Sequence, residues 1–151
     1  MSNLQRERDA RNWIVATLEA TGIYDAVYSG AFAREDGRSA EDKRVAIVEP
    51  LDSTPFDPWS GGDGPFDYVE CRLTLAFEAR ERDGIDCDDQ AERLYAVAAN
   101  ALTGSNLGGL AMPAFSKFGR TAWRPPKAPG RRIEATFTYR YLVDEGLNVD
   151  P

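Results

Sequence analysis

The sequence contains no histidine, and this absence excludes many mechanisms before any motif is considered. Ser-His-Asp and Cys-His nucleophiles, His-ligated zinc sites and histidine pH switches all require an imidazole. Cys71 and Cys87 are the only cysteines, too few for a disulfide framework or a four-cysteine zinc site. A hydroxyl or thiol nucleophile would therefore need an amine as its base. Because Lys43, Lys117 and Lys127 fall in predicted loops or strand edges, we expect no enzymatic activity and no cofactor.

Long hydrophobic runs and a basic excess are also missing. The longest stretch without charge, residues 94–116, is interrupted by Gly, Asn and Pro and does not predict a membrane span. Residues 1–11 are polar and lack the apolar core of a signal peptide. The formal net charge of −7 argues against a general nucleic-acid binder. We expect a soluble protein, made in a reducing compartment, with no membrane partner.

Two amphipathic helices are predicted from apolar residues at helical spacing. The first pattern ends at Gly22 and the second at Gly104, and glycine is favoured just after a helix because it enters the left-handed conformation without strain. Asp86 is a candidate N-cap of the second helix, with Asp88 and Asp89 in its first turn. The first stripe is Ala10, Trp13, Ile14, Thr17, Leu18 and Thr21; the second is Ala91, Leu94, Tyr95, Ala98, Ala101 and Leu102.

Strict alternation of apolar and polar residues predicts two long strands, 68–80 and 132–143, each with one buried face. Their polar faces both mix Arg, Glu and Thr, so we expect the two strands to be neighbours with opposite charges adjacent. Shorter strands are predicted at 23–28, at 44–49 (stopped by Pro50) and at 117–123. The chain then reads α-β-β-β-α-β-β in one domain, residues 1–151. This order predicts an α+β fold, an antiparallel or mixed sheet with two main helices on one face.

Residues 50–67 are predicted to form a long loop between strands. This segment holds four prolines, three glycines and three large aromatic residues, Phe56, Trp59 and Phe66. Structureless loops of this length are uncommon in compact domains, and disordered segments are normally poor in aromatics. Two interpretations stay open: a compact loop packed on its own side chains, or an arm that inserts into a partner.

Acidic and glycine-rich motifs do not predict a catalytic or metal site. The acids between Asp83 and Asp89 lack the alternating ligands and distal glutamate of a calcium loop, and a turn followed by a helix N-cap explains them better. The glycines of residues 104–109 follow a helix, whereas a phosphate cradle precedes one. No spacing singles out a pair of carboxylates for acid–base chemistry. We therefore expect no metal ligands.

One charge feature stands out. Residues 117–132 carry six bases and no acid, so this segment is +6 and the rest of the chain is −7 − 6 = −13. Such segregation favours contact with an acidic partner, and a second copy of the chain would serve; head-to-tail contact of this kind can close a ring. One alternative is a nucleic-acid partner, with Trp123 stacking on a base. The other is a solvated basic hairpin without a partner. The bases are Lys117, Arg120, Arg124, Lys127, Arg131 and Arg132.

The assembled pattern resembles the tail terminator proteins of long-tailed bacteriophages. The resemblance lies in the N-terminal helix, the long loop before the strand 68–80, the helix 91–102 and the closing strand 132–144. The resemblance covers most of the chain and lies in the order of the elements, their lengths and their general residue pattern. The family has no invariant catalytic or binding motif, so the resemblance assigns no site residue.

The resemblance implies a structural role in the virion tail or neck, assembled in the host cytoplasm. Such proteins form a hexameric ring that caps the tail tube, ends its polymerisation and faces the head connector, while DNA passes through the lumen without specific binding. The loop 50–67 would then dock on the tube protein or a neighbouring subunit, and Arg120, Arg124, Arg131 and Arg132 would contact other subunits. The alternatives are a head–tail adaptor, a tube subunit, or a small ligand-binding or enzymatic α+β domain.

Overall fold

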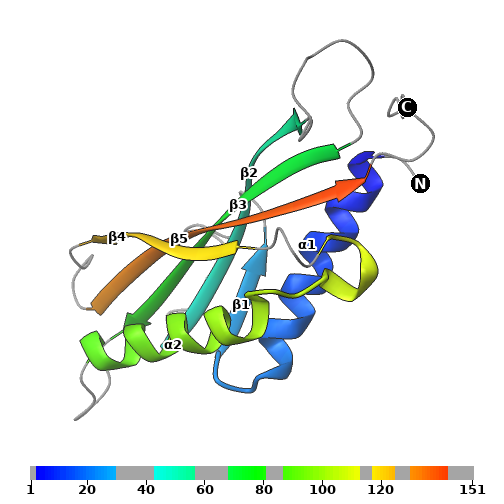
Figure 1. The fold of residues 1–151 in the computed structure, drawn as a ribbon. Helices are drawn as coiled ribbons and strands as arrows, with labels where there is room; N and C mark the ends of the chain where they lie inside the picture. The colour runs from blue at the N-terminus through cyan, green and yellow to red at the C-terminus, as the bar shows by residue number, and fades with distance from the viewer. Residues whose placement is uncertain are drawn as a thin grey trace.

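The computed structural model describes residues 3–29, 43–56, 68–80, 87–112, 117–124 and 130–142, and shows two helices on one face of a five-stranded sheet (Figure 1). Its elements follow the predicted order α-β-β-β-α-β-β, which confirms the α+β class. The helices are α1 (Asn3–Ala20) and α2 (Cys87–Leu102), with the short 3-10 turn η2 (Leu107–Gly109) after α2. The strands are β1 (Ala26–Ser29), β2 (Arg44–Phe56), β3 (Tyr68–Arg80), β4 (Lys117–Arg124) and β5 (Gly130–Leu142).

The sheet has the strand order β1-β2-β3-β5-β4 and is mixed. β1 pairs with β2 in parallel, and the other neighbours pair antiparallel. The two long alternating strands, β3 and β5, are neighbours from Tyr68 opposite Leu142 to Arg80 opposite Gly130. Their predicted adjacency is therefore confirmed.

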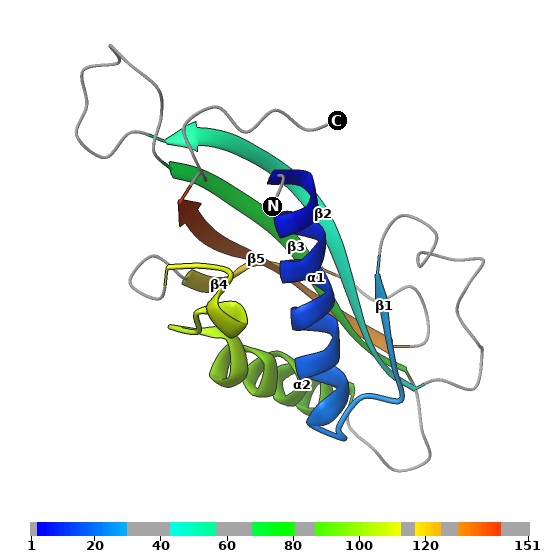
Figure 2. The same cartoon turned by 90° about the vertical axis from the view of Figure 1, so that its right-hand side faces the viewer.

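The main core lies between the two helices and one face of the sheet, and a second, small cluster of Val45, Ile47 and Ala76 is buried on the other face. Every residue expected to point inward from β3 is buried, as is every described residue expected to do so from β5; Val143 lies outside the described residues. Both strands thus follow the period-two rule of a strand with one covered face. Figure 2 shows α1 and α2 on the same side of the sheet, with the end of β2 and the start of β3 reaching away from α2. The inward residues are Val69, Cys71, Leu73, Leu75, Phe77, Ala79, Ile133, Ala135, Phe137, Tyr139 and Tyr141.

The helices bury most, but not all, of the predicted stripes. α1 begins at Asn3, well before the first stripe residue, and buries Ala10, Ile14 and Leu18. Trp13 is half-buried, and Thr21 is exposed beyond the helix end, where its hydroxyl donates to the Leu18 carbonyl. α2 buries Ala91, Leu94, Ala98 and Leu102 and carries the predicted Asp88 and Asp89 in its first turn, whereas the candidate cap Asp86 lies outside the described residues. Both glycines that were expected to follow the helices have a left-handed φ, +72° at Gly22 and +75° at Gly104.

The prediction that Pro50 ends the second strand is wrong, and so is the loop start at residue 50. β2 continues to Phe56, paired with β3, after an irregularity between Pro50 and Asp52. A bulge of this kind and an edge position are the places where a sheet tolerates proline. Both apply here, because β1 pairs only with residues 45–48 and leaves the rest of β2 at the edge of the described sheet. The remainder of the predicted loop, residues 57–67, lies outside the described residues.

Candidate subunit interface

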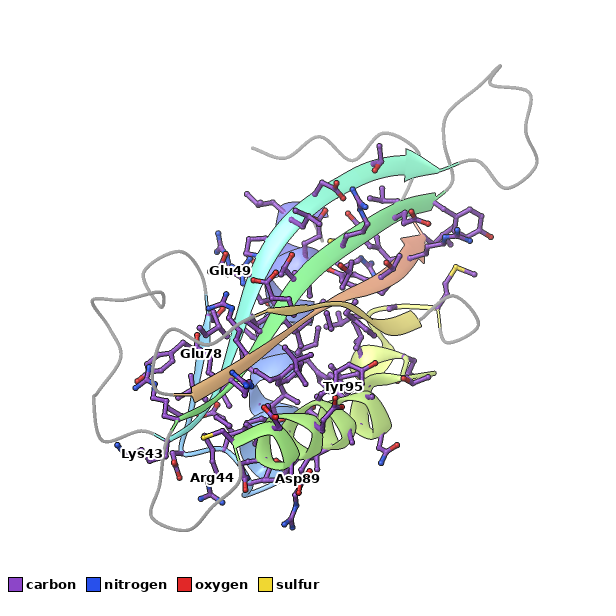
Figure 3. The ribbon with its side chains drawn as sticks, turned by 90° about the vertical axis from the view of Figure 1, so that its left-hand side faces the viewer. Lys43, Arg44, Glu49, Glu78, Asp89 and Tyr95 are labelled. Atoms are coloured by element: carbon purple, nitrogen blue, oxygen red, sulfur yellow. The ribbon has the colours of Figure 1, made fainter. Side chains whose placement is uncertain are left out.

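The face of the sheet that no described helix covers carries a ladder of ion pairs. Glu70 and Arg140 stand opposite each other on β3 and β5, with Arg140 Nη2 at 2.7 Å from Glu70 Oε2. Farther along, Arg132 Nη1 lies 2.7 Å from Glu78 Oε2, and Arg132 Nε lies 3.2 Å from Glu134 Oε1. The predicted alternation of opposite charges across these strands is therefore confirmed. Figure 3 shows side chains along this sheet, with Glu49 on β2 and Glu78 on β3 labelled.

A further ion pair extends the ladder onto the second half of β2. Asp52 stands opposite Arg72, and the guanidinium of Arg72 binds its carboxylate through two nitrogens. The hydrogen bond from Arg72 holds the pKa of Asp52 below its ordinary value. Exposed pairs of this kind contribute little stability. Because acids and bases alternate, the ladder orders its side chains without giving the face a strong net charge.

The edge of β2 changes character where β1 ends. Residues 45–48, which pair with β1, are buried, whereas residues 50–54 are all exposed. Leu51, at the irregularity, has 52% of its surface exposed, unusual for a leucine inside a strand. A strand edge that presents backbone groups and an apolar side chain to solvent is suited to pairing with another chain. Sequence reasoning missed this edge because it ended the strand at Pro50.

Three apolar or aromatic residues lie in one row at the far end of this face. Phe56 stands opposite Tyr68 in the register, and Tyr68 and Leu142 stand opposite each other on the face that no described helix covers. Leu142 is 52% exposed. Phe56 is the predicted interface residue that the structure places at the end of β2, while Trp59 and Phe66 lie outside the described residues.

Two of the six predicted basic contacts form ion pairs within the chain. Arg131 pairs with Asp88 in the first turn of α2, and Arg132 pairs with Glu78 and Glu134 on the sheet. The prediction placed both arginines against a partner, and their internal pairing means that charge reversal there would also disturb the fold. Lys117, Arg120 and Arg124 lie on β4, the edge strand at the opposite side of the sheet from β1. Lys127 lies outside the described residues.

On the helix side, a polar cluster joins α1 to the sheet. The Tyr141 hydroxyl donates to Glu7 Oε2 at 2.6 Å, and the Cys71 thiol lies 3.6 Å from Glu7 Oε1. Arg6 lies over the Tyr141 ring, 5.5 Å from its centroid. Burial raises the pKa of the Cys71 thiol to about 12, so little thiolate forms at neutral pH. The cluster is suited to holding α1 in place and not to nucleophilic chemistry.

No group of three or more Cys, Asp or Glu residues capable of holding a metal ion occurs within the described ranges. The acidic tract that was compared with a calcium loop is described only from residue 87 onward, where Asp88 and Asp89 belong to α2. Searched over the same part of the chain, no helix has the length and apolar character needed to cross a membrane.

Comparisons with known proteins give matches among solved structures. No family model matches the chain, and no curated protein matches its sequence. Among solved structures, it resembles the sheath/tube terminator of an extracellular contractile injection system, PVC, in its extended state, with a TM-score of 0.49 and 13% sequence identity. The match covers 95% of this chain and 59% of that one, so the chain spans well under two thirds of the other protein. A likeness at this level carries no inference about family or function.

Proposed function

We propose that the chain is a structural subunit of a ring that caps the tail tube of a phage or phage-like particle. In this role the ring ends tube polymerisation and presents its other side to the head connector, and DNA passes through the lumen without specific binding. The chain performs no catalytic step and holds no cofactor. It acts in the tail or neck of the particle, after assembly in the host cytoplasm.

The observation that carries the proposal is the one-sided sheet with two exposed edges. The described helices cover one face only. The other face carries the ion-pair ladder and the small buried cluster of Val45, Ile47 and Ala76, and both β4 and the second half of β2 lie at edges of the described sheet. Two different edges on opposite sides of one sheet favour head-to-tail contacts between identical subunits. Contacts of that kind build rings or tubes, which agrees with the family resemblance of the element order.

The decisive experiment measures the mass of the purified chain and its action on growing tubes. We expect a hexamer by native mass spectrometry, and we expect added protein to shorten tubes and to be found at their ends by electron microscopy. A chain that stays monomeric at all concentrations, with and without tube protein, would contradict the proposal and favour a small binding domain. A chain that polymerises by itself would be a tube subunit instead.

A further inference from the structure

Two strand edges of the same length lie on opposite sides of the sheet. β4 (Lys117–Arg124) has eight residues, and it pairs only with β5 among the described strands. The part of β2 beyond the pairing with β1, Glu49–Phe56, also has eight residues. Residues 50–54 within it are all exposed. Each edge is therefore a site where a further strand can add to the sheet.

The directions of the two edges suit each other. β2 is antiparallel to β3, β3 to β5 and β5 to β4, so β4 runs antiparallel to β2 within one subunit. Within one subunit Glu49 shares a row with Thr74, Thr136 and Gly119, four residues along the strands from the row of Arg124. An end-to-end contact therefore requires a ring axis inclined to the strands, as in a barrel with tilted strands. In such a ring, β4 of one subunit meets β2 of the next in antiparallel orientation, and the sheets join into one continuous wall.

The faces of the two edges also match. Aligned end to end, Glu49 stands opposite Arg124 and Phe56 stands opposite Lys117. In the register these four positions stand opposite Thr74, Arg132, Tyr68 and Thr138, which lie on the face that no described helix covers. A single irregularity in only one edge would put one end on the wrong face. Each edge contains one irregularity near its middle, between Pro50 and Asp52 and between Arg120 and Ala122, so the faces agree at both ends.

The charges of the two edges are opposite. β4 carries Lys117, Arg120 and Arg124 and no acid, whereas Glu49–Phe56 carries Glu49 and Asp52 and no base. Asp52 binds Arg72 within the subunit, and the alignment places Glu49 opposite Arg124. Two β2 edges facing each other would bring acids and no base into the contact. In addition, Pro50 and Pro55 have no N–H, so an edge of this kind is short of donors and suits a different strand better than itself.

We propose that subunits of the ring join by antiparallel pairing of β4 with residues Glu49–Phe56 of the next copy, with Arg124 opposite Glu49. This assignment rests on the ring of the proposed function and names its subunit contact. The occupant of each edge is a second copy of this chain.

Disulfide trapping tests the alignment directly. In a chain carrying both Glu49→Cys and Arg124→Cys, the two cysteines lie three strands apart and four residues out of register within one subunit, so more than about 14 Å separates them. They cannot form a disulfide there, whereas across the proposed contact their Cα atoms come within about 7 Å. We expect mild oxidation to give a ladder of covalent oligomers up to the ring, on a non-reducing gel.

Three controls accompany this variant. The parent chain, whose Cys71 is buried and Cys87 half-buried, should give no ladder. The pair Glu49→Cys with Lys117→Cys joins opposite ends of the aligned edges and should also give none. Glu49→Cys alone should not form dimers, and if it does, β2 pairs with itself and the proposal is wrong. Each variant is first compared with the parent under reducing conditions, by native mass and circular dichroism.

A charge swap provides a second, independent readout. Glu49→Arg alone and Arg124→Glu alone should each raise the concentration for half-assembly about tenfold, and the double variant should restore it. Glu19→Arg on α1 and Arg93→Glu on α2 are matched controls at exposed positions and should have little effect.

The outcomes separate this inference from the proposed function. If rings form but no disulfide-linked oligomers appear and the charge swap does not change assembly, the pairing is wrong and the ring of the proposed function still stands. If disulfide-linked oligomers form but the rings do not cap tubes, the pairing is supported and the capping role is contradicted. A chain that never assembles overturns both.

Discussion

At the scale of residues, two tyrosines on β5 have the same burial and different surroundings. Tyr139 and Tyr141 are 0% and 1% exposed. The Tyr141 hydroxyl donates to Glu7, whereas the Tyr139 hydroxyl lies beside the weakly hydrogen-bonding Cys71 sulfur and makes no hydrogen bond of ordinary geometry within the described residues. Burial raises the pKa of Tyr139 far above its ordinary value, so it stays neutral.

We therefore expect opposite outcomes from removing the two hydroxyls. Tyr141→Phe leaves a Glu7 oxygen without its donor and should lower the free energy of unfolding by about 1–2 kcal/mol. Tyr139→Phe removes a hydroxyl with no good partner and should change it by less than about 0.5 kcal/mol. Urea unfolding at constant m-value measures both, and equal losses from the two variants would contradict the assignment.

A second pair of residues separates backbone strain from side-chain contact. Gly104 and Gly108 have φ of +75° and +70°. A Cβ at Gly104 meets nothing within 4 Å, but a Cβ at Gly108 would lie 2.7 Å from Trp13 Nε1. Gly104→Ala should lower the free energy of unfolding by about 1 kcal/mol, because alanine is strained in the left-handed conformation. Gly108→Ala should cost about 2–4 kcal/mol, since Trp13 must also move. Thermal and urea unfolding measure both variants. Equal losses in the free energy of unfolding would contradict the close packing of Trp13 on Gly108.

At the scale of elements, the starts of β1 and β2 are tied together by one carboxylate. Asp25 Oδ2 accepts the backbone N–H groups of Lys43 and Arg44, both at 2.9 Å, and Arg44 Nη2 lies 2.8 Å from Oδ1. Partial burial opposes ionisation of Asp25, but these hydrogen bonds together with the Arg44 charge hold its pKa below the ordinary value. A lowered carboxyl pKa stabilises the fold above the unfolded-state pKa, and the effect is lost as pH falls through the folded-state value.

The expected pH dependence follows from that sign. Asp25→Asn should lower the free energy of unfolding by about 0.5–1 kcal/mol near pH 7. The difference from the parent should stay constant down to about pH 5, shrink below about pH 4, and close as pH falls through the lowered folded-state pKa of Asp25. Urea unfolding of both chains at several pH values measures it. A gap that is unchanged or wider at low pH would contradict the role of Asp25.

The two halves of β2 should differ in protection. Residues 45–48 are buried between β1 and β3, whereas residues 50–54 are exposed at the edge. We expect amide hydrogen exchange to be slow in the first half and faster in the second while the chain is monomeric. Assembly through the proposed edge should slow exchange in the second half and in β4, and should leave β3 unchanged. Equal protection of both edges before and after assembly would contradict the proposed contact.

At the scale of the whole molecule, the charge is divided between a basic segment and an acidic remainder. Residues 117–132 contribute +6 and the other residues −13. Arg131 and Arg132 use their charges within the subunit, and Lys117, Arg120 and Arg124 stand on the edge strand β4. The segregation is therefore partly a feature of the fold, and the proposed contact between subunits uses the part that lies on β4.

Assembly should consequently weaken as salt is added. Screening shortens the reach of the attraction between a basic and an acidic surface, with a Debye length of about 10 Å at 0.1 M and about 3 Å at 1 M. We expect sedimentation velocity to show smaller species as the salt concentration rises over this range at fixed protein concentration. An oligomer that is unchanged or larger at high salt would indicate an apolar contact instead.

The sequence by itself determined the α+β class, the order of the elements and which side of β3, β5 and the helices is buried. These features follow from local periodicity, because each residue's neighbours at two or at three and four positions set its face. Only the tertiary structure decided that β2 runs through Pro50. A strand tolerates a proline where no neighbouring strand would accept a hydrogen bond from its missing N–H. β1, a strand from elsewhere in the chain, ends before it reaches Pro50. For the same reason the sequence placed Arg131 and Arg132 in the basic segment, while the fold brought them against Asp88 and Glu78.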